Sequence, residues 1–256
     1  MAAADRERVA AYYNRLAPVY GDGQFFAARR ASVLAAMADE LAMAQRLLDL
    51  GCGNGAFGIE LAERSPRTLI VGADLSRGML HEARQRLGQQ VPLVEADACA
   101  LPFRSGTFDL IFMSHVLLLV PDIERCVAEI ARGLAPGGTL VATVGAGGWR
   151  AALGAFGFSE GLLRLATRLG ARHLPTSDDT TRANAACRAA GLHPESRRAP
   201  FSVTWPALEE WIRIRWLTTL DEPFRSVVRL WLSATHRRHK SRTLSLDETV
   251  LVATKP

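Results

Sequence analysis

The 256-residue chain contains few cysteines, almost no lysine and no long apolar run. Its four cysteines, Cys52, Cys99, Cys126 and Cys187, form no Cys-x-x-Cys pair and have no histidine cluster nearby. This spacing argues against a bound metal ion and favours reduced thiols. No apolar stretch approaches the roughly 18 residues that a membrane-spanning helix requires, and the first residues lack an apolar signal core. We therefore expect a cytoplasmic protein without a membrane span.

Lys240 and Lys255 are the only lysines, so arginine dominates the formal net charge of +5. Arginine-rich, lysine-poor composition is typical of GC-rich bacterial genomes, and the charge need not indicate a polyanionic partner. The most basic segment, residues 236–242, contains no aromatic residue and follows an expected helix, whose C-terminal end favours cations. We therefore expect no nucleic-acid partner.

Three glycines at alternating positions follow a short apolar run, and this is the most informative pattern in the chain. Leu47–Leu50 predicts a buried strand, and Gly51, Gly53 and Gly55 predict a tight turn after it. Glycine lets the backbone approach a ligand closely, and a helix expected at Ala56–Arg64 begins directly afterwards. The segment therefore predicts a binding site for a small polar cofactor.

A dinucleotide-dependent oxidoreductase is one interpretation of this turn. Gly53–Gly58 fits the pattern G-x-G-x-x-G, and Asp74 lies at about the distance of 20 residues that the fingerprint requires. Two observations point elsewhere. Gly51 already stands at the strand end behind the acidic Asp49, and Glu95–Ala98 supplies a further acidic site that hydride transfer does not need.

Short apolar or β-branched runs alternate with helix-length segments along the chain, which is typical of a parallel sheet covered by helices on both faces. We expect an α/β fold with a seven-stranded, mostly parallel, Rossmann-like sheet. The expected strands are Leu47–Leu50, Thr68–Ala73, Pro92–Glu95, Leu110–Met113, Thr139–Val144, Arg198–Thr204 and Thr249–Ala253.

Helical segments at both ends of this pattern are expected to cap the sheet within one domain. We expect an N-terminal helical cap over residues 1–45, a cofactor-binding core over 46–145, and a C-terminal part over 146–256. The C-terminal part contains the last two strands and, in the insertion before the final strand, a helical substrate cap at about 206–238. Ligands bind at the carboxyl ends of the strands in open α/β sheets, where these caps would lie.

Five motifs follow one another in a specific order. They are LLDLGCGNG from Leu47, VGADLSRGML from Val71, EADACALPF from Glu95, FDLIFMSHVLLLVPD from Phe108 and LAPGGTLV from Leu134. With these motifs the chain resembles the class I S-adenosylmethionine-dependent methyltransferases, and within them the small-molecule branch that includes the ubiquinone/menaquinone-biosynthesis enzymes. Tyr13–Tyr20 is similar to the N-terminal segment of that branch. Beyond residue 145 the resemblance is one of architecture only.

The resemblance implies S-adenosylmethionine as the cofactor. In the family the glycine turn holds the methionine part, with an acid such as Asp49 supporting its amino group. An acid at Asp74 accepts the ribose hydroxyls, Leu75 and Ala98 lie against the adenine, and Asp97 accepts from the adenine amino group. The implied cofactor-binding residues are Asp49, Gly51, Cys52, Gly53, Gly55, Asp74, Leu75, Met79, Asp97, Ala98 and Ser114.

Some of these positions also have a purely structural interpretation. Asp74 can cap a helix that begins near Ser76. Cys52 can simply be a small side chain that fills a tight turn. Asp97 can be an ordinary loop acid.

His115, Tyr13 and Tyr20 are the candidate catalytic residues. Ser114 and His115 follow the fourth expected strand, where the resemblance implies that the methyl group points. Many relatives carry His-His or Glu-His before the following Pro-Asp, but this chain has Leu118-Leu119 there, so no base is assigned to those positions. His115 can remove a proton near neutral pH, or can merely pack. Positioning alone accelerates methyl transfer to a reactive acceptor, so a base need not be required.

Aromatic residues concentrate in the C-terminal part, which suggests a small, fairly hydrophobic acceptor, because such pockets are largely aromatic. The candidate substrate-binding residues are Tyr13, Trp149, Trp205, Trp211 and Trp216. Trp211 also fits a helical core position. We expect methylation of an oxygen or nitrogen, less readily carbon, in bacterial specialised biosynthesis.

Two further functions stay open on the same pattern. One is a non-methylating cyclase or decarboxylase that binds S-adenosylmethionine. The other is an RNA or protein methyltransferase, against which the sequence Met113–Val116 counts, since amide-nitrogen methylation favours Asn-Pro-Pro-Tyr at this position. The oligomeric state is expected to be monomer or homodimer.

Overall fold

The computed structural model describes residues 2–20, 23–144, 154, 180–213, 217, 222 and 224–256. Trp149 and Trp216, both expected to contact the acceptor, lie outside these residues.

Seven strands in the described part of the chain form one sheet with the order β3-β2-β1-β4-β5-β7-β6. The strands are β1 (Arg46–Leu50), β2 (Leu69–Asp74), β3 (Leu93–Glu95), β4 (Phe108–Ser114), β5 (Leu134–Thr143), β6 (His193–Thr204) and β7 (Thr243–Thr254). Neighbouring strands among β1 to β5 pair in parallel, whereas β7 runs antiparallel to both β5 and β6. The predicted seven-stranded, mostly parallel sheet is therefore confirmed.

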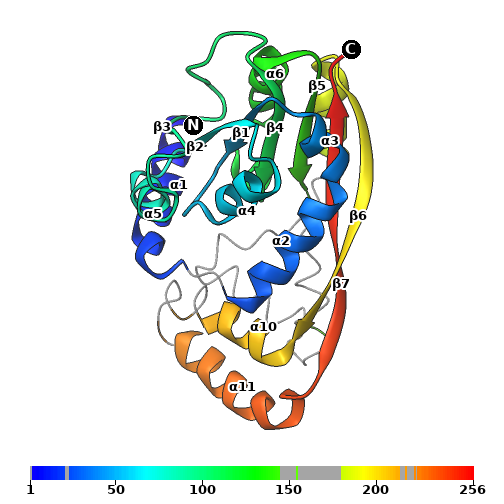
Figure 1. Ribbon diagram of the computed structural model, residues 1–256. Helices are drawn as coiled ribbons and strands as arrows, with labels where there is room; N and C mark the ends of the chain where they lie inside the picture. Colours follow the sequence, from blue (N-terminus) through cyan, green and yellow to red (C-terminus); the bar gives the residue numbers. More distant parts are fainter. Residues whose placement is uncertain are drawn as a thin grey trace.

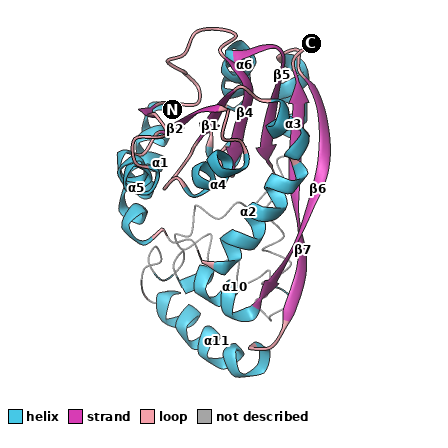
Figure 2. Ribbon diagram, in the orientation of Figure 1, coloured by secondary structure: helices cyan, strands magenta, loops and turns pink. Residues whose placement is uncertain are grey.

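Helices lie on both faces of the sheet (Figures 1 and 2). The described helices are α1 (Ala2–Leu16), α2 (Gln24–Ala36), α3 (Ala38–Met43), α4 (Ala56–Arg64), α5 (Arg77–Leu87), α6 (Ile123–Gly133), α9 (Thr180–Ala189), α10 (Trp205–Ile212) and α11 (Phe224–His239). Because successive side chains of a strand point to opposite faces, β4 supplies two cores. Leu110 and Phe112 pack with α2 to α5, and Ile111 and Met113 pack with α6 and α9.

The last two strands extend far beyond the rest of the sheet. β6 pairs with β7 over its whole length, but β5 reaches only as far as Val250 of β7. The outer parts, residues 198–204 and 243–249, form a two-stranded ribbon past the carboxyl end of β5, and α10 and α11 lie at its end (Figure 1). The helices expected at about 206–238 are therefore present in the described part of that segment.

The cap has a hydrophobic core of its own. Its members come from α2, β6, α10, α11 and β7, and the largest contributions are Phe25, Phe201, Trp205, Leu208, Trp211 and Leu232. The ring of Trp205 packs edge-on against Trp231 with centroids 5.6 Å apart. No helix in the described residues combines the length and the apolar character needed to cross a membrane.

We expect Leu208→Ala to destabilise the protein by about 2–5 kcal/mol, because Leu208 is completely buried and the smaller side chain leaves a cavity. Chemical denaturation followed by tryptophan fluorescence measures the change. Leu230→Ala is the control, since Leu230 of α11 is 74% exposed and its loss should change stability by less than about 0.5 kcal/mol. Equal effects of the two substitutions would contradict the described cap core.

Candidate active site at the carboxyl ends of the strands

The glycine turn after β1 has the tight geometry that its sequence predicts. Gly51, Gly53 and Gly55 have φ values of 77°, 55° and 79°, which favour glycine. A Cβ on Gly51 would lie 2.1 Å from Cγ2 of Val116, whereas no described residue lies within 4 Å of a Cβ on Gly53. The turn is thus closed on one side by protein and leaves open space at Gly53. Burial raises the pKa of the neighbouring Cys52 thiol, which favours a packing role for that side chain.

Asp49 is the most unusual residue beside this turn. It lies inside β1 and is 2% exposed, and its Oδ2 atom has no hydrogen-bond partner among the described residues. Burial, and to a smaller extent the negative charge of Asp74, raise the pKa of Asp49 to about 7. A buried polar atom without a partner costs free energy. This oxygen is therefore available for a donor on a bound ligand, and an ammonium group has the matching charge.

Asp74, at the end of β2, joins the glycine turn to the start of α5. Its carboxylate accepts hydrogen bonds from the backbone N–H groups of Gly53 at 2.9 Å and Ser76 at 2.8 Å. The cap of α5 is Ser76, whose Oγ accepts from Met79 N–H, so the alternative cap role for Asp74 is wrong. The backbone N–H of Leu75 is a third donor to this carboxylate. A carboxylate has about four acceptor positions, so Asp74 keeps some capacity for a ligand hydroxyl.

Asp97 follows β3 and makes contacts on both of its carboxylate oxygens. Oδ1 accepts from Cys99 N–H at 2.9 Å, and Oδ2 accepts from Arg6 Nη1 of α1 at 3.3 Å. The side chain is 27% exposed, so it can also reach a ligand.

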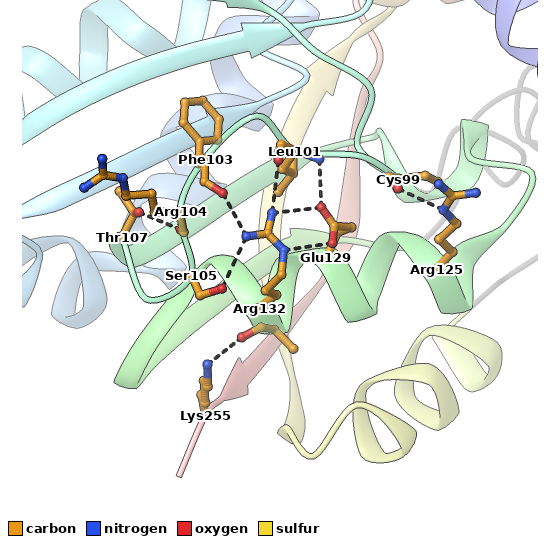
Figure 3. Close-up of polar contacts among 11 residues, drawn as sticks. Cys99, Leu101, Phe103, Arg104, Ser105, Thr107, Arg125, Glu129, Arg132 and Lys255 are labelled. Carbon is orange, nitrogen blue, oxygen red and sulfur yellow. Dashed lines mark hydrogen bonds and ion pairs between the residues drawn. The ribbon is translucent and has the colours of Figure 1, made fainter.

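Helix α6 holds the loop that carries Asp97 (Figure 3). Arg132 donates to the carbonyl oxygens of Leu101 at 3.0 Å and Phe103 at 2.8 Å, and Glu129 accepts from Leu101 N–H at 2.8 Å. Arg125 donates to Cys99 O at 3.0 Å. Charge-assisted bonds of this kind are stronger than neutral ones, so the loop after β3 has a defined position.

The N-terminal segment touches all three strand ends just described. Besides the Arg6 contact, Asn14 Oδ1 accepts from Ser76 Oγ at 2.7 Å and from Gly78 N–H at 2.8 Å. Asn54 in the glycine turn donates to Tyr20 O at 2.7 Å. The part of residues 1–45 that forms α1 and the following turn therefore lies against the same edge of the sheet as the turn and the acids.

The two candidate tyrosines, Tyr13 and Tyr20, are neighbours, with ring centroids 6.4 Å apart. Tyr20 also contacts Phe26 at 5.7 Å. Both tyrosines are half-buried, so each keeps some accessible surface. Tyr20 is joined to the glycine turn by the hydrogen bond from Asn54 to its carbonyl oxygen.

The end of β4 carries a polar network that sequence reasoning found only in part. Nε2 of His115 lies 3.0 Å from Oε2 of Glu248, and the His115 N–H donates to Thr143 Oγ1 at 2.8 Å. Arg29 Nε lies 2.9 Å from the same Glu248 oxygen, and Arg29 Nη2 donates to Ser114 Oγ at 2.6 Å. The sequence signal is a charged residue at a position that the apolar period assigns to the core. Arg29 stands at helical spacing from Phe25 and Val33, and Glu248 alternates with Leu246 and Val250.

Several predicted ligand contacts are instead buried side chains. Trp205 is 0% exposed, and Trp211, at 8%, stacks on Phe25 in the cap core. Met79 is 1% exposed. The structure therefore favours packing over ligand contact for these three residues. Leu75 and Ala98, by contrast, are half-buried beside Asp74 and Asp97.

The predicted site residues that the structure brings to one edge of the sheet are Asp49, Gly51, Gly53, Gly55, Asp74, Asp97, Ser114 and His115. Within the described part of the chain, no group of three or more His, Cys, Asp or Glu side chains is arranged to hold a metal ion.

Comparison with known proteins identifies the segment that contains this edge. A family model described as a methyltransferase domain matches residues 48–142. This segment is therefore similar to a methyltransferase domain. It contains the glycine turn, the acids after β2 and β3, and the end of β4.

The chain is 42% identical over 100 residues to a demethylmenaquinone methyltransferase from Thermus thermophilus, a match that covers 38% of this chain and 46% of that protein. It is also 42% identical over 101 residues to a malonyl-[acyl-carrier protein] O-methyltransferase from Legionella pneumophila, covering 39% of this chain and 36% of that protein. The chain thus spans less than half of the length of these relatives.

The fold as a whole is similar to that of solved class I methyltransferase-like proteins. The crystal structure of the [4+2]-cyclase SpnF aligns with a TM-score of 0.62 and 20% sequence identity, over 97% of this chain and 95% of that chain. The predicted Rossmann-like fold of the class I methyltransferases is therefore confirmed.

We expect Asp49→Asn to stabilise the ligand-free protein above pH 7 by a few kcal/mol. The raised pKa means that the folded state keeps a proton which the unfolded chain gives up, so the stability of the wild type falls as the pH rises from about 4 through 7. Thermal unfolding at several pH values measures this. The exposed Asp39→Asn is the control, and an advantage of Asp49→Asn that is independent of pH would contradict the assignment.

Proposed function

We propose that this protein is an S-adenosylmethionine-dependent methyltransferase that transfers a methyl group to an oxygen or nitrogen atom of a small, fairly hydrophobic metabolite. The observation that carries the proposal is the unpaired, buried Asp49 carboxylate oxygen beside the glycine turn of a methyltransferase domain. The ammonium of the methionine moiety has the charge and the hydrogen-bond donors that this oxygen lacks.

The remaining contacts follow from the chemistry of each residue. The backbone of Gly51, Gly53 and Gly55 borders the methionine moiety, because only a turn without side chains allows this approach. The acceptor capacity that remains on Asp74 receives the ribose hydroxyls. Asp97 accepts from the adenine amino group and is shared with Arg6.

Bound S-adenosylmethionine supplies an electrophilic methyl group on a sulfonium. The protein then has to hold an acceptor atom in line with that methyl group, at about 3–3.5 Å. Tyr13, Tyr20, Ser114 and His115 border this end of the site, and His115 is the residue that can take up a proton there.

We propose that the methyl acceptor is a small molecule. More specifically, we propose that the protein acts in bacterial specialised biosynthesis. The relatives are named for a demethylated quinone and for a malonyl group on a carrier protein. These two acceptors are chemically different, so they support the reaction class and not one substrate.

A non-methylating enzyme is the second candidate. The [4+2]-cyclase SpnF matches nearly the whole chain in fold, and fold alone does not decide the reaction. Release of S-adenosylhomocysteine from S-adenosylmethionine in the presence of a panel of alcohols, phenols, amines and carboxylates distinguishes the two. Transfer to any of them supports the methyltransferase. Conversion of a polyunsaturated probe without that release supports the cyclase.

Asp74→Ala should weaken S-adenosylhomocysteine binding by at least about 100-fold, because it removes the ribose acceptor and two bonds that hold the turn. Isothermal titration calorimetry measures the affinity, with NAD as a competing ligand and Asp39→Ala as the control. Binding of NAD without binding of S-adenosylhomocysteine would refute the proposed cofactor.

Cofactor affinity should also depend on pH through Asp49. Below about pH 7 this residue takes up a proton and loses its attraction for an ammonium group, so affinity should fall up to about tenfold per pH unit. Calorimetric titrations at pH 5.5 to 8.5 test this. Asp49→Asn should bind weakly throughout and without the pH dependence, and a flat wild-type profile would argue against the Asp49 contact.

A further inference from the structure

A buried ion pair lies at the end of β4, beside the methyl-transfer end of the proposed site. Glu248 and Arg29 are 0% and 7% exposed. The pairing of β5 with β7 ends at Thr143 opposite Val250, so Glu248 lies two residues past that row and on the same face. Arg29 belongs to the buried side of α2, which packs on β7. The register of β7 therefore places Glu248, and the packing of α2 places Arg29, so that the two charges meet.

Both members of the ion pair also contact residues at the end of β4. Burying two charges costs more free energy than their attraction returns unless further hydrogen bonds compensate. Here Arg29 also donates to Ser114, and Glu248 also contacts His115. Burial alone would raise the pKa of Glu248, but His115 and Arg29 outweigh that effect and lower it. Glu248 is therefore ionised and can only accept hydrogen bonds.

His115 is held in an uncommon conformation by this network. Its φ of 57° is the one positive value at a non-glycine residue in the described part of the chain. Such a backbone costs free energy and persists where the surroundings impose it. Thr143 holds the backbone N–H, Glu248 holds the ring at Nε2, and the side chain stays 26% exposed.

We infer that Glu248, backed by Arg29, positions His115 as a general base for an acceptor hydroxyl group, so that the methyl group is transferred to oxygen. The inference rests on the proposed function. Because Glu248 accepts from Nε2, the neutral ring carries its proton there and its lone pair on Nδ1.

The step then balances as follows. Nδ1 takes the hydroxyl proton while the oxygen forms its bond to the methyl carbon, the carbon–sulfur bond breaks, and sulfur keeps the electron pair. The imidazolium that results is balanced by Glu248. An amine or an ionised phenolate needs only positioning, whereas a hydroxyl needs a base, which typically contributes about 10²- to 10⁴-fold in rate. A buried network that orients His115 therefore favours the second case.

Glu248→Gln tests the inference, because it keeps the size of the side chain and removes its charge. The matched control is Glu60→Gln, since Glu60 forms an ion pair with Arg30, the neighbour of Arg29 on α2, at 2.7 Å. With an alcohol from the acceptor panel we expect kcat to fall about 100-fold in Glu248→Gln. The KM for S-adenosylmethionine should not change, and Glu60→Gln should match the wild type.

A second measurement does not depend on turnover. In the full chain with ¹⁵N-labelled histidine and bound S-adenosylhomocysteine at pH 8, NMR should find His115 protonated on Nε2. In the double variant Arg29→Met/Glu248→Met, which leaves no unpaired buried charge, we expect a mixture of the two tautomers. If Glu248→Gln does not fold, the double variant is used for the test in its place.

A wild-type His115 protonated on Nδ1, an unchanged kcat in Glu248→Gln, or a clear preference for amines over alcohols would overturn the inference. Absence of S-adenosylhomocysteine binding would instead refute the proposed function, and the tautomer of His115 in the ligand-free protein would still be measurable.

Discussion

The parallel pairing of β1 with β2 and β4 is the constraint on which the rest of the structure depends. It brings the ends of three strands to one edge of the sheet, and each end carries a side chain that would be unfavourable elsewhere: Asp49, Asp74 and His115. The backbone of the glycine turn and the carboxylate of Asp74 then hold the strand ends at fixed spacing. Without this pairing the two acids would be far apart, and with it they lie side by side at one edge of the sheet.

The sheet and the glycine turn could be predicted because both are local patterns. The alternation of strands and helices can be recognised in the sequence alone. The glycines stand where the backbone has a positive φ, 77° at Gly51, which other residues rarely adopt. Glu248 could not be predicted in the same way. Its meaning depends on the register of β7 against β5, and on an arginine more than 200 positions earlier in the chain. Neither the spacing of residues nor the composition predicts an ion pair between residues so far apart in the chain.

For Glu248 the sequence missed a residue of the site, whereas for the tryptophans it predicted ligand contacts for side chains that are buried. Their density in the C-terminal part suggests a pocket, but Trp205 and Trp211 form the interior of the cap. An aromatic side chain gains as much from a protein neighbour as from a ligand, so composition cannot tell the two apart. What composition does indicate is that this part of the chain has enough apolar surface for a core separate from that of the sheet.

The ribbon formed by the outer parts of β6 and β7 has a mechanical consequence. In the described part of the chain no third strand pairs with this ribbon, and two-stranded ribbons twist more than wide sheets. The ribbon carries the cap helices α10 and α11 (Figure 1). The ion pair of Arg29 and Glu248 joins α2 to β7 near the base of the ribbon. A change in the twist of the ribbon would therefore be felt at this ion pair, and through Glu248 at His115.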